Sequence, residues 1–186
     1  MNRAELEHII RAASGITNQA DIVVIGSQSI LAQFPNAPPD LLVSMEADVF
    51  PLHRPDLSIQ VDGAIGERSI FHETFGYYAH GVDETTAILP DGWIQRLVPI
   101  RNPNTSGATG WCLDVYDLAA SKLVAGREKD LDFVRVLLSK DMIRLGTMGK
   151  RIAALPLPPE RLTDTHERLK RLKPPDCFNP PADVSL

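Results

Sequence analysis

The chain reads DIVVIGSQSILAQF over residues 21–34. Its first five residues are rich in β-branched side chains, which predicts a short buried strand over residues 21–25. A helix is predicted to follow over residues 27–33, with Gly26 in the turn and Ser27 at the helix start. The free N–H groups of such a start can hold a phosphate chain. The alternative is a tight turn and a helix cap with no further role.

Residues 43–51 read VSMEADVFP and carry two acids, Glu46 and Asp48. The alternation of side chains predicts a strand over residues 45–50, with both acids on one face and apolar side chains on the other. Two carboxylates on one face can share a metal ion. The alternative is the wet face of an edge strand. Taken with the Gly-Ser turn, the acid pair indicates nucleotide chemistry.

Further elements lie on either side of these two stretches. Apolar residues recur at helical spacing over residues 3–14 and 56–65, which predicts two helices. Residues 85–89 and 93–100 flank the turn sequence PDG, and this pattern predicts a β-hairpin. Another strand is expected over residues 111–115. The chain therefore mixes helices and strands.

A second group of charged residues lies in residues 114–138, which read DVYDLAASKLVAGREKDLDFVRVLL. We expect a helix that begins near Asp117, because aspartate is a favoured N-cap. In that helix Lys122 points toward the apolar side. Beyond Gly126, Asp130 shares a face with apolar residues at helical offsets. Both charges are thus expected to be buried.

A buried Asp130 needs a partner, because an unpaired buried charge is strongly unfavourable. Lys122 and Arg127 are the candidates within reach. The pairing serves either phosphate binding or structure alone, and spacing does not separate these two readings. Asp132, by contrast, lines up with Arg135 and is expected to face solvent.

Composition indicates one globular domain: the 186 residues are 44% hydrophobic and 23% charged. No apolar run approaches the roughly 20 residues that cross a bilayer, and the N-terminal MNRAELEHIIRAA is amphipathic. We therefore expect a cytoplasmic protein without membrane contact. Cys112 and Cys177 are far apart and belong to no metal-binding motif, so we expect two reduced thiols.

The formal net charge of −5 excludes a protein whose whole surface binds nucleic acid. Positive charge does gather in the last third of the chain, where we favour a solvated helix face over an RNA contact. The basic residues there are Lys150, Arg151, Arg161, Arg168, Lys170, Arg171 and Lys173.

The order of these motifs resembles the minimal nucleotidyltransferase fold, and particularly the branch related to nucleotidyltransferase toxins of abortive-infection and toxin–antitoxin systems. In that branch a strand, Gly-Ser and a helix precede a strand with Asp-x-Asp, and a later lysine precedes a basic-Lys-Asp-x-x-Asp-like stretch. The resemblance covers roughly residues 20–140. The matching residues are Gly26-Ser27, Glu46-Ala47-Asp48, Lys122 and REKDLD.

The resemblance implies an α/β (α+β) fold with a nucleotidyltransferase-like mixed β-sheet flanked by helices, and with C-terminal helices. We expect a nucleotidyltransferase-like domain over residues 1–140 and a helical appendage over residues 141–173. A proline-rich tail is expected over residues 174–186.

The resemblance also implies a Mg²⁺ ion bound by Glu46 and Asp48, and a nucleoside triphosphate as substrate. Gly26, Ser27 and Arg127 would bind the nucleotide, with the Ser27 hydroxyl and nearby N–H groups on the triphosphate. The chain departs from the pattern at Glu46, where the family usually has aspartate.

Two further catalytic residues are implied. Lys122 would neutralise charge on the transferred group, and Asp130 would orient Lys122 or Arg127. Polymerase-like members carry a third carboxylate on a neighbouring strand. The predicted hairpin offers none, and Asp114 is a weak substitute.

The implied reaction moves a nucleoside monophosphate to RNA, including tRNA, or to another hydroxyl acceptor, and the protein would belong to a toxin–antitoxin pair with a cognate toxin or antitoxin protein. The alternative is a catalytically inert domain that binds a protein or RNA. The basic C-terminal helices and the proline-rich tail would then form the interaction surface.

Overall fold

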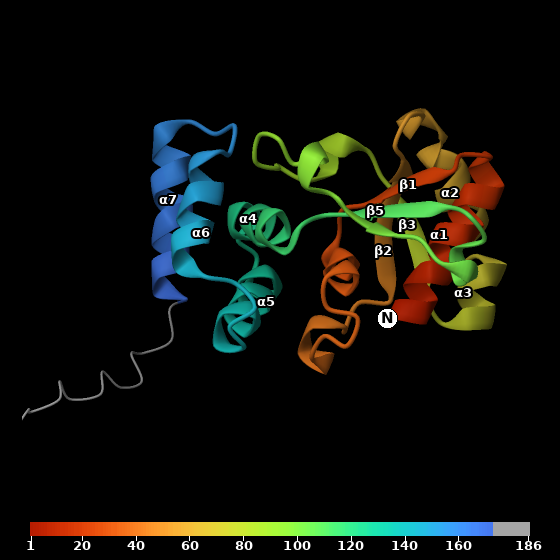
Figure 1. Ribbon diagram of the computed structural model, residues 1–186, viewed down its shortest axis with the longest axis horizontal. Helices are drawn as coiled ribbons and strands as arrows, with labels where there is room; N and C mark the ends of the chain where they lie inside the picture. Colours follow the sequence, from red (N-terminus) through yellow and green to blue (C-terminus); the bar gives the residue numbers. More distant parts are fainter. Residues whose placement is uncertain (173–186) are drawn as a thin grey trace, which may run out of the picture.

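The computed structural model describes residues 1–172 and contains a five-stranded sheet (Figure 1). The strands lie in the order β3-β2-β1-β5-β4. β1 is parallel to β5 and antiparallel to β2, while β3 is parallel to β2 and β4 is antiparallel to β5. This mixed sheet confirms the predicted fold class. Its strands are β1 (Asp21–Val24), β2 (Glu46–Pro51), β3 (Tyr78–Gly81), β4 (Val98–Ile100) and β5 (Thr109–Cys112).

Helices flank the sheet in two groups (Figure 1). The first three lie beside the sheet, where α1 contacts β1, β2 and β5. The last four lie at the opposite end of the molecule, with α6 and α7 outermost. The helices are α1 (Arg3–Thr17), α2 (Ser58–Ile65), α3 (Ile70–Phe75), α4 (Val115–Ala125), α5 (Glu128–Ser139), α6 (Leu145–Ala153) and α7 (Pro159–Arg171).

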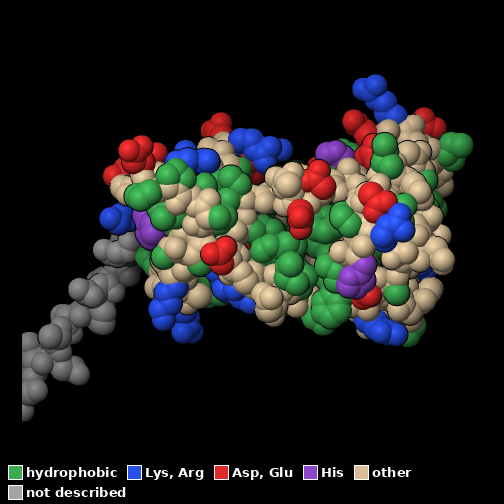
Figure 2. Space-filling model, turned by 90° about the horizontal axis from the view of Figure 1, so that it is seen from above, with side chains coloured by type: hydrophobic (Ala, Val, Ile, Leu, Met, Phe, Trp, Pro, Cys, Tyr) green, Lys and Arg blue, Asp and Glu red, His purple; other side chains and the backbone are tan. Residues whose placement is uncertain are grey.

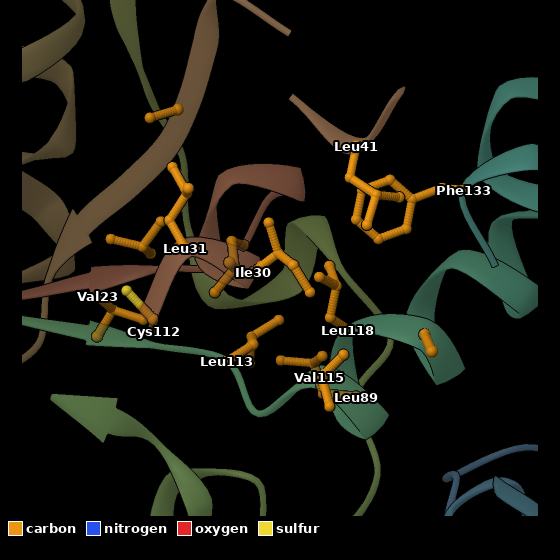
Figure 3. Packing of buried hydrophobic residues seen from close by; sticks show 14 of the residues in the cluster. Val23, Ile30, Leu31, Leu41, Leu89, Cys112, Leu113, Val115, Leu118 and Phe133 are labelled. Carbon is orange, nitrogen blue, oxygen red and sulfur yellow. The ribbon is translucent and has the colours of Figure 1, made fainter. Parts of the chain in front are cut away.

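One hydrophobic core runs from the sheet to α4 (Figure 3). Val23 in β1 and Cys112 in β5 are fully buried, as their central position in the sheet requires. Leu113 and Leu118 continue the core into α4 with at most 1% exposure. Each such side chain contributes about 1.5–3 kcal/mol on burial. The sheet therefore fixes the position of α4.

The C-terminal helices pack on α4 and complete its end. Arg168 in α7 donates from Nη1 to the carbonyl oxygens of Leu123 (2.8 Å) and Val124 (3.0 Å). These carbonyls lie in the last turn of α4, where backbone oxygens lack hydrogen-bond partners within the helix.

The domain boundary at residue 140 stays a prediction, and the proline-rich tail lies outside the described residues. No helix within residues 1–172 has the length and apolar character that a membrane crossing requires.

The predicted β-hairpin is wrong. Residues 85–89 form no strand: Thr85 and Thr86 lie in a 3₁₀ helix, Glu84–Thr86, and β4 pairs with β5 instead. Arg96, in the 3₁₀ helix Ile94–Arg96, turns toward Asp117, and its Nε lies 2.8 Å from Oδ2. This ion pair ties the segment to α4.

The N-cap of α4 is Asp114, three residues before the predicted position. Its carboxylate accepts a hydrogen bond from the Tyr116 N–H at 3.0 Å. Asp117 lies within the first turn and is fully buried. It contacts Arg96 and Arg151 instead of capping the helix.

The helix predicted after Gly26 is present as a 3₁₀ helix, Ser27–Ala32. Both the N–H and the hydroxyl of Ser29 donate to the Gly26 carbonyl, at 3.0 and 2.8 Å. These short-range bonds favour the tighter winding. The strand expected at residues 111–115 begins earlier, at Thr109, and ends at Cys112.

Candidate nucleotide-binding site

The acid pair lies on the face of β2 that the alternation predicts. Ala47 and Val49 are fully buried on the opposite face, whereas Glu46 and Asp48 are half-buried. Parallel pairing places Tyr78 of β3 beside Glu46, and His80 of β3 beside Asp48. Four polar side chains from two neighbouring strands therefore share one face of the sheet.

These four side chains contact one another. The Tyr78 hydroxyl donates to Oε2 of Glu46 at 2.9 Å. His80 Nδ1 lies 3.3 Å from Oδ1 of Asp48 and 4.0 Å from Oε1 of Glu46. One donor atom each from Glu46, Asp48 and His80 lies within 4.8 Å of the others. Two carboxylates and an imidazole at this spacing fit a divalent cation.

The acid pair is electrostatically unfavourable by itself. Burial, followed by repulsion from Glu46, raises the pKa of Asp48 to about 6, and His80 partly opposes the rise. Burial and the hydrogen bond to Glu46 raise the pKa of Tyr78 to about 12. Tyr78 therefore keeps its proton at neutral pH and remains a donor. A cation between the acids would relieve their repulsion.

Gly26 packs directly against the acid pair. A Cβ at this position would lie 2.0 Å from Oδ2 of Asp48. The backbone of Gly26 is extended, so it is space and not backbone conformation that demands glycine. The neighbouring Ile25 N–H donates to the Asp48 carbonyl at 3.0 Å. The turn at Gly26 therefore packs against Asp48 of β2.

Lys122 points from α4 toward this turn. Its Nζ donates to Oγ of Ser27 at 2.9 Å and to Oδ1 of Asp130 at 3.1 Å, and it lies 4.5 Å from the ring centre of Phe133. Only 11% of the side chain is exposed. Burial lowers the pKa of Lys122, and Asp130 opposes the shift. The predicted orientation toward the apolar side is confirmed.

Asp130 binds both predicted partners. Arg127 donates from Nε to Oδ2 at 2.6 Å, while Lys122 occupies the other carboxylate oxygen. Burial alone would raise the pKa of Asp130, but Arg127 and Lys122 outweigh it and lower the pKa. The Arg127 side chain is 65% exposed, so its guanidinium remains accessible. Asp132 is exposed at the surface, as predicted, and pairs there with Arg135.

A cleft of about 1110 Å³ brings both groups together between the sheet and α4–α5. Leu41 and Phe133 of α5, both labelled in Figure 3, are among its apolar lining residues. All seven residues that the sequence analysis selected line this cleft, and His80 lines it with them. The seven are Gly26, Ser27, Glu46, Asp48, Lys122, Arg127 and Asp130.

A family described as a nucleotidyltransferase of unknown function (DUF6036) matches residues 4–157 of this sequence. The chain belongs to this family. The match includes the whole sheet, every cleft residue named above, α1 except for Arg3, and α2 to α6. No curated protein and no solved structure matches the chain.

Tyr78 and His80 were not predicted from the sequence as residues of this site. Both lie in β3, a strand of four residues that was not predicted. The available signal was the alternation of Tyr78 and His80 within a segment bounded by Gly76 and Gly81. Asp114, considered as a substitute third carboxylate, is the N-cap of α4 and pairs with Arg151.

The basic C-terminal residues divide into different roles. Arg151 forms ion pairs with acids of α4, and Arg168 binds the end of that helix. Arg161 lines the cleft. On the face shown in Figure 2, basic and acidic side chains are interspersed. Lys173 lies outside the described residues.

Proposed function

We propose that the protein transfers a nucleoside monophosphate from a nucleoside triphosphate to a hydroxyl acceptor, with the cleft as the reaction site. The observation that carries the proposal is the convergence of two groups on one cleft. The first group is the acid pair of β2, and the second is Lys122 with its Ser27 and Asp130 contacts. Phosphoryl-type transfer depends on such positioning and charge stabilisation.

In this proposal Glu46, Asp48 and His80 hold a divalent cation, with Mg²⁺ the ion expected from the sequence. When bound, such an ion neutralises phosphate charge and orients the phosphate oxygens. Tyr78 fixes the Glu46 carboxylate by its hydrogen bond. Gly26 leaves room for the Asp48 carboxylate beside the turn.

Lys122 and Arg127 contribute positive charge to the triphosphate, and the Ser27 hydroxyl contributes a hydrogen bond. Asp130 holds the Lys122 and Arg127 side chains in place, because each of its carboxylate oxygens accepts a hydrogen bond from one of them. The acceptor hydroxyl loses its proton to solvent and its oxygen bonds to the α-phosphorus. The bond from that phosphorus to the bridging oxygen breaks, and pyrophosphate leaves.

We further propose RNA, with tRNA as the first candidate, as the acceptor and a role as a toxin–antitoxin component. Arg127, Lys129 and Arg161 line the cleft and support an anionic acceptor. The resemblance to nucleotidyltransferase toxins supports the biological role.

A transfer assay tests the proposal. The full chain is incubated with MgCl₂ or MnCl₂, each α-labelled nucleoside triphosphate and total tRNA. We expect label on RNA with the wild type and with Asp164→Asn, which changes an exposed acid of α7, but not with Asp48→Asn. Absence of both transfer and nucleotide binding in the wild type would contradict the proposal and favour an inert binding domain.

A further inference from the structure

We infer that the metal site of this protein prefers Mn²⁺ to Mg²⁺ because its third protein donor is the imidazole of His80. The inference rests on the proposed function, since it concerns the cation of the same site. The inferred preference for Mn²⁺ differs from the sequence-based expectation, which was a Mg²⁺ ion and for which a third protein ligand was sought among carboxylates.

The sheet register places His80 at this site. β2 and β3 are parallel, and Asp48 is paired with His80 across the two strands. Both side chains therefore leave the sheet on the same face, with Nδ1 as the ring nitrogen nearest the acids. His80 is 51% exposed, so its ring can rotate toward a bound ion without disturbing the core.

The two acids are held more firmly than the histidine. Tyr78 binds Glu46, and the glycine turn restricts Asp48 to the space that Gly26 leaves open. Supporting contacts of this kind orient metal ligands and tune their affinity. The site thus combines two fixed oxygen donors with one adjustable nitrogen donor.

Other acids along the cleft do not supply a third carboxylate. Asp130 is bound by Lys122 and Arg127, and Asp132 is paired with Arg135. Asp40, the remaining acid of the cleft lining, is not among the donors that lie within 4.8 Å of one another. Within residues 1–172, the group of three donors close enough to hold an ion is the one that contains His80.

The donor set has a chemical consequence. Mg²⁺ favours oxygen ligands in a near-ideal octahedron and gives up its waters reluctantly. Mn²⁺ accepts similar oxygen ligands, and as a transition metal it also binds imidazole nitrogen. One nitrogen in place of a carboxylate oxygen therefore weakens Mg²⁺ binding more than Mn²⁺ binding.

Metal binding to the full chain, without nucleotide or acceptor, tests the inference. MnCl₂ and MgCl₂ are titrated calorimetrically into the wild type, His80→Ala and His80→Asp. We expect His80→Ala to weaken Mn²⁺ binding at least about 10-fold and Mg²⁺ binding less. His80→Asp should favour Mg²⁺ relative to the wild type. His53→Ala, which changes a 71% exposed histidine away from the acid pair, should leave both affinities unchanged.

Pulsed electron paramagnetic resonance of bound Mn²⁺ gives an independent signature. We expect coupling to an imidazole ¹⁴N nucleus in the wild type and none in His80→Ala. Equal Mn²⁺-to-Mg²⁺ affinity ratios in the wild type, His80→Ala and His80→Asp, or no nitrogen coupling in the wild type, would overturn the inference. Because neither readout involves nucleotide transfer, His80-dependent Mn²⁺ binding without transfer would count against the proposed reaction alone.

Discussion

Replacing Asp48 by asparagine should stabilise the metal-free protein while abolishing the proposed metal site. The pKa of Asp48 rises from 3.8 to about 6 in the folded chain, because the carboxylate is buried and faces Glu46. Its charge therefore destabilises the folded state. This penalty is absent below about pH 4 and fully present above about pH 6.

The shift of roughly two pKa units sets an upper limit of about 3 kcal/mol on the penalty. The Asp48 side chain is 23% exposed, so solvent screening reduces the expected gain to about 1–2 kcal/mol. For a chain of this size the gain corresponds to a rise in Tm of about 2–8 °C at pH 8. The difference should shrink by about half at pH 5.

Thermal unfolding in EDTA measures this effect, with Asp164→Asn as the control for removal of an exposed acid. Saturating Mn²⁺ should then reverse the order, because the ion stabilises only the chain that binds it. A Tm for Asp48→Asn that is equal to or below that of the wild type at pH 8 in EDTA would refute the reasoning.

Two further variants probe the packing around the acids and the buried lysine. Gly26→Ala places a Cβ 2.0 Å from Asp48 Oδ2, so it should lower both Tm and Mn²⁺ affinity. The control Gly15→Ala, which adds a Cβ in open space on α1, should lower neither quantity. Equal effects of the two variants would argue against the close contact. Asp130→Ala leaves Lys122 without its carboxylate and should reduce the free energy of unfolding by about 3 kcal/mol in urea titrations, with partial recovery on adding Lys122→Met. An unchanged urea midpoint would show that the ion pair contributes nothing.

The elements predicted correctly are those whose patterns are local. The β-branched run of β1 and the alternation of β2 each encode a burial pattern within a few residues. The helical spacing of Leu6, Ile9 and Ile10 does the same for α1. In each case the buried face seen in the structure is the one that the pattern selects.

The elements that were missed depend on distant partners. β3 is short and contains alanine and glycine, which are weak strand formers, and it exists because it pairs with β2. Residues 85–89 have strand-like composition, but the Arg96 pair with Asp117 draws the following segment to α4. Tertiary contacts override local propensity at both places.

The residues of the candidate site likewise divide into those that local spacing predicts and those that depend on tertiary structure. Lys122 and Asp130 were paired from sequence because a buried charge requires a partner, and the helix spacing limited the choice. His80 reaches the acids only through the register of two parallel strands, which no short motif encodes. The role of Gly26 beside Asp48 was likewise hidden, since it depends on how closely the turn approaches β2.

The most direct test of the account is an anomalous diffraction map of crystals grown with Mn²⁺ and a non-hydrolysable nucleoside triphosphate. We predict a manganese peak bonded to Glu46, Asp48 and His80, with the phosphates extending toward Lys122 and Ser27. Manganese and nucleotide bound elsewhere, or a cleft that stays empty at saturating concentrations of both, would contradict the assignment of this cleft as the site of nucleotide transfer.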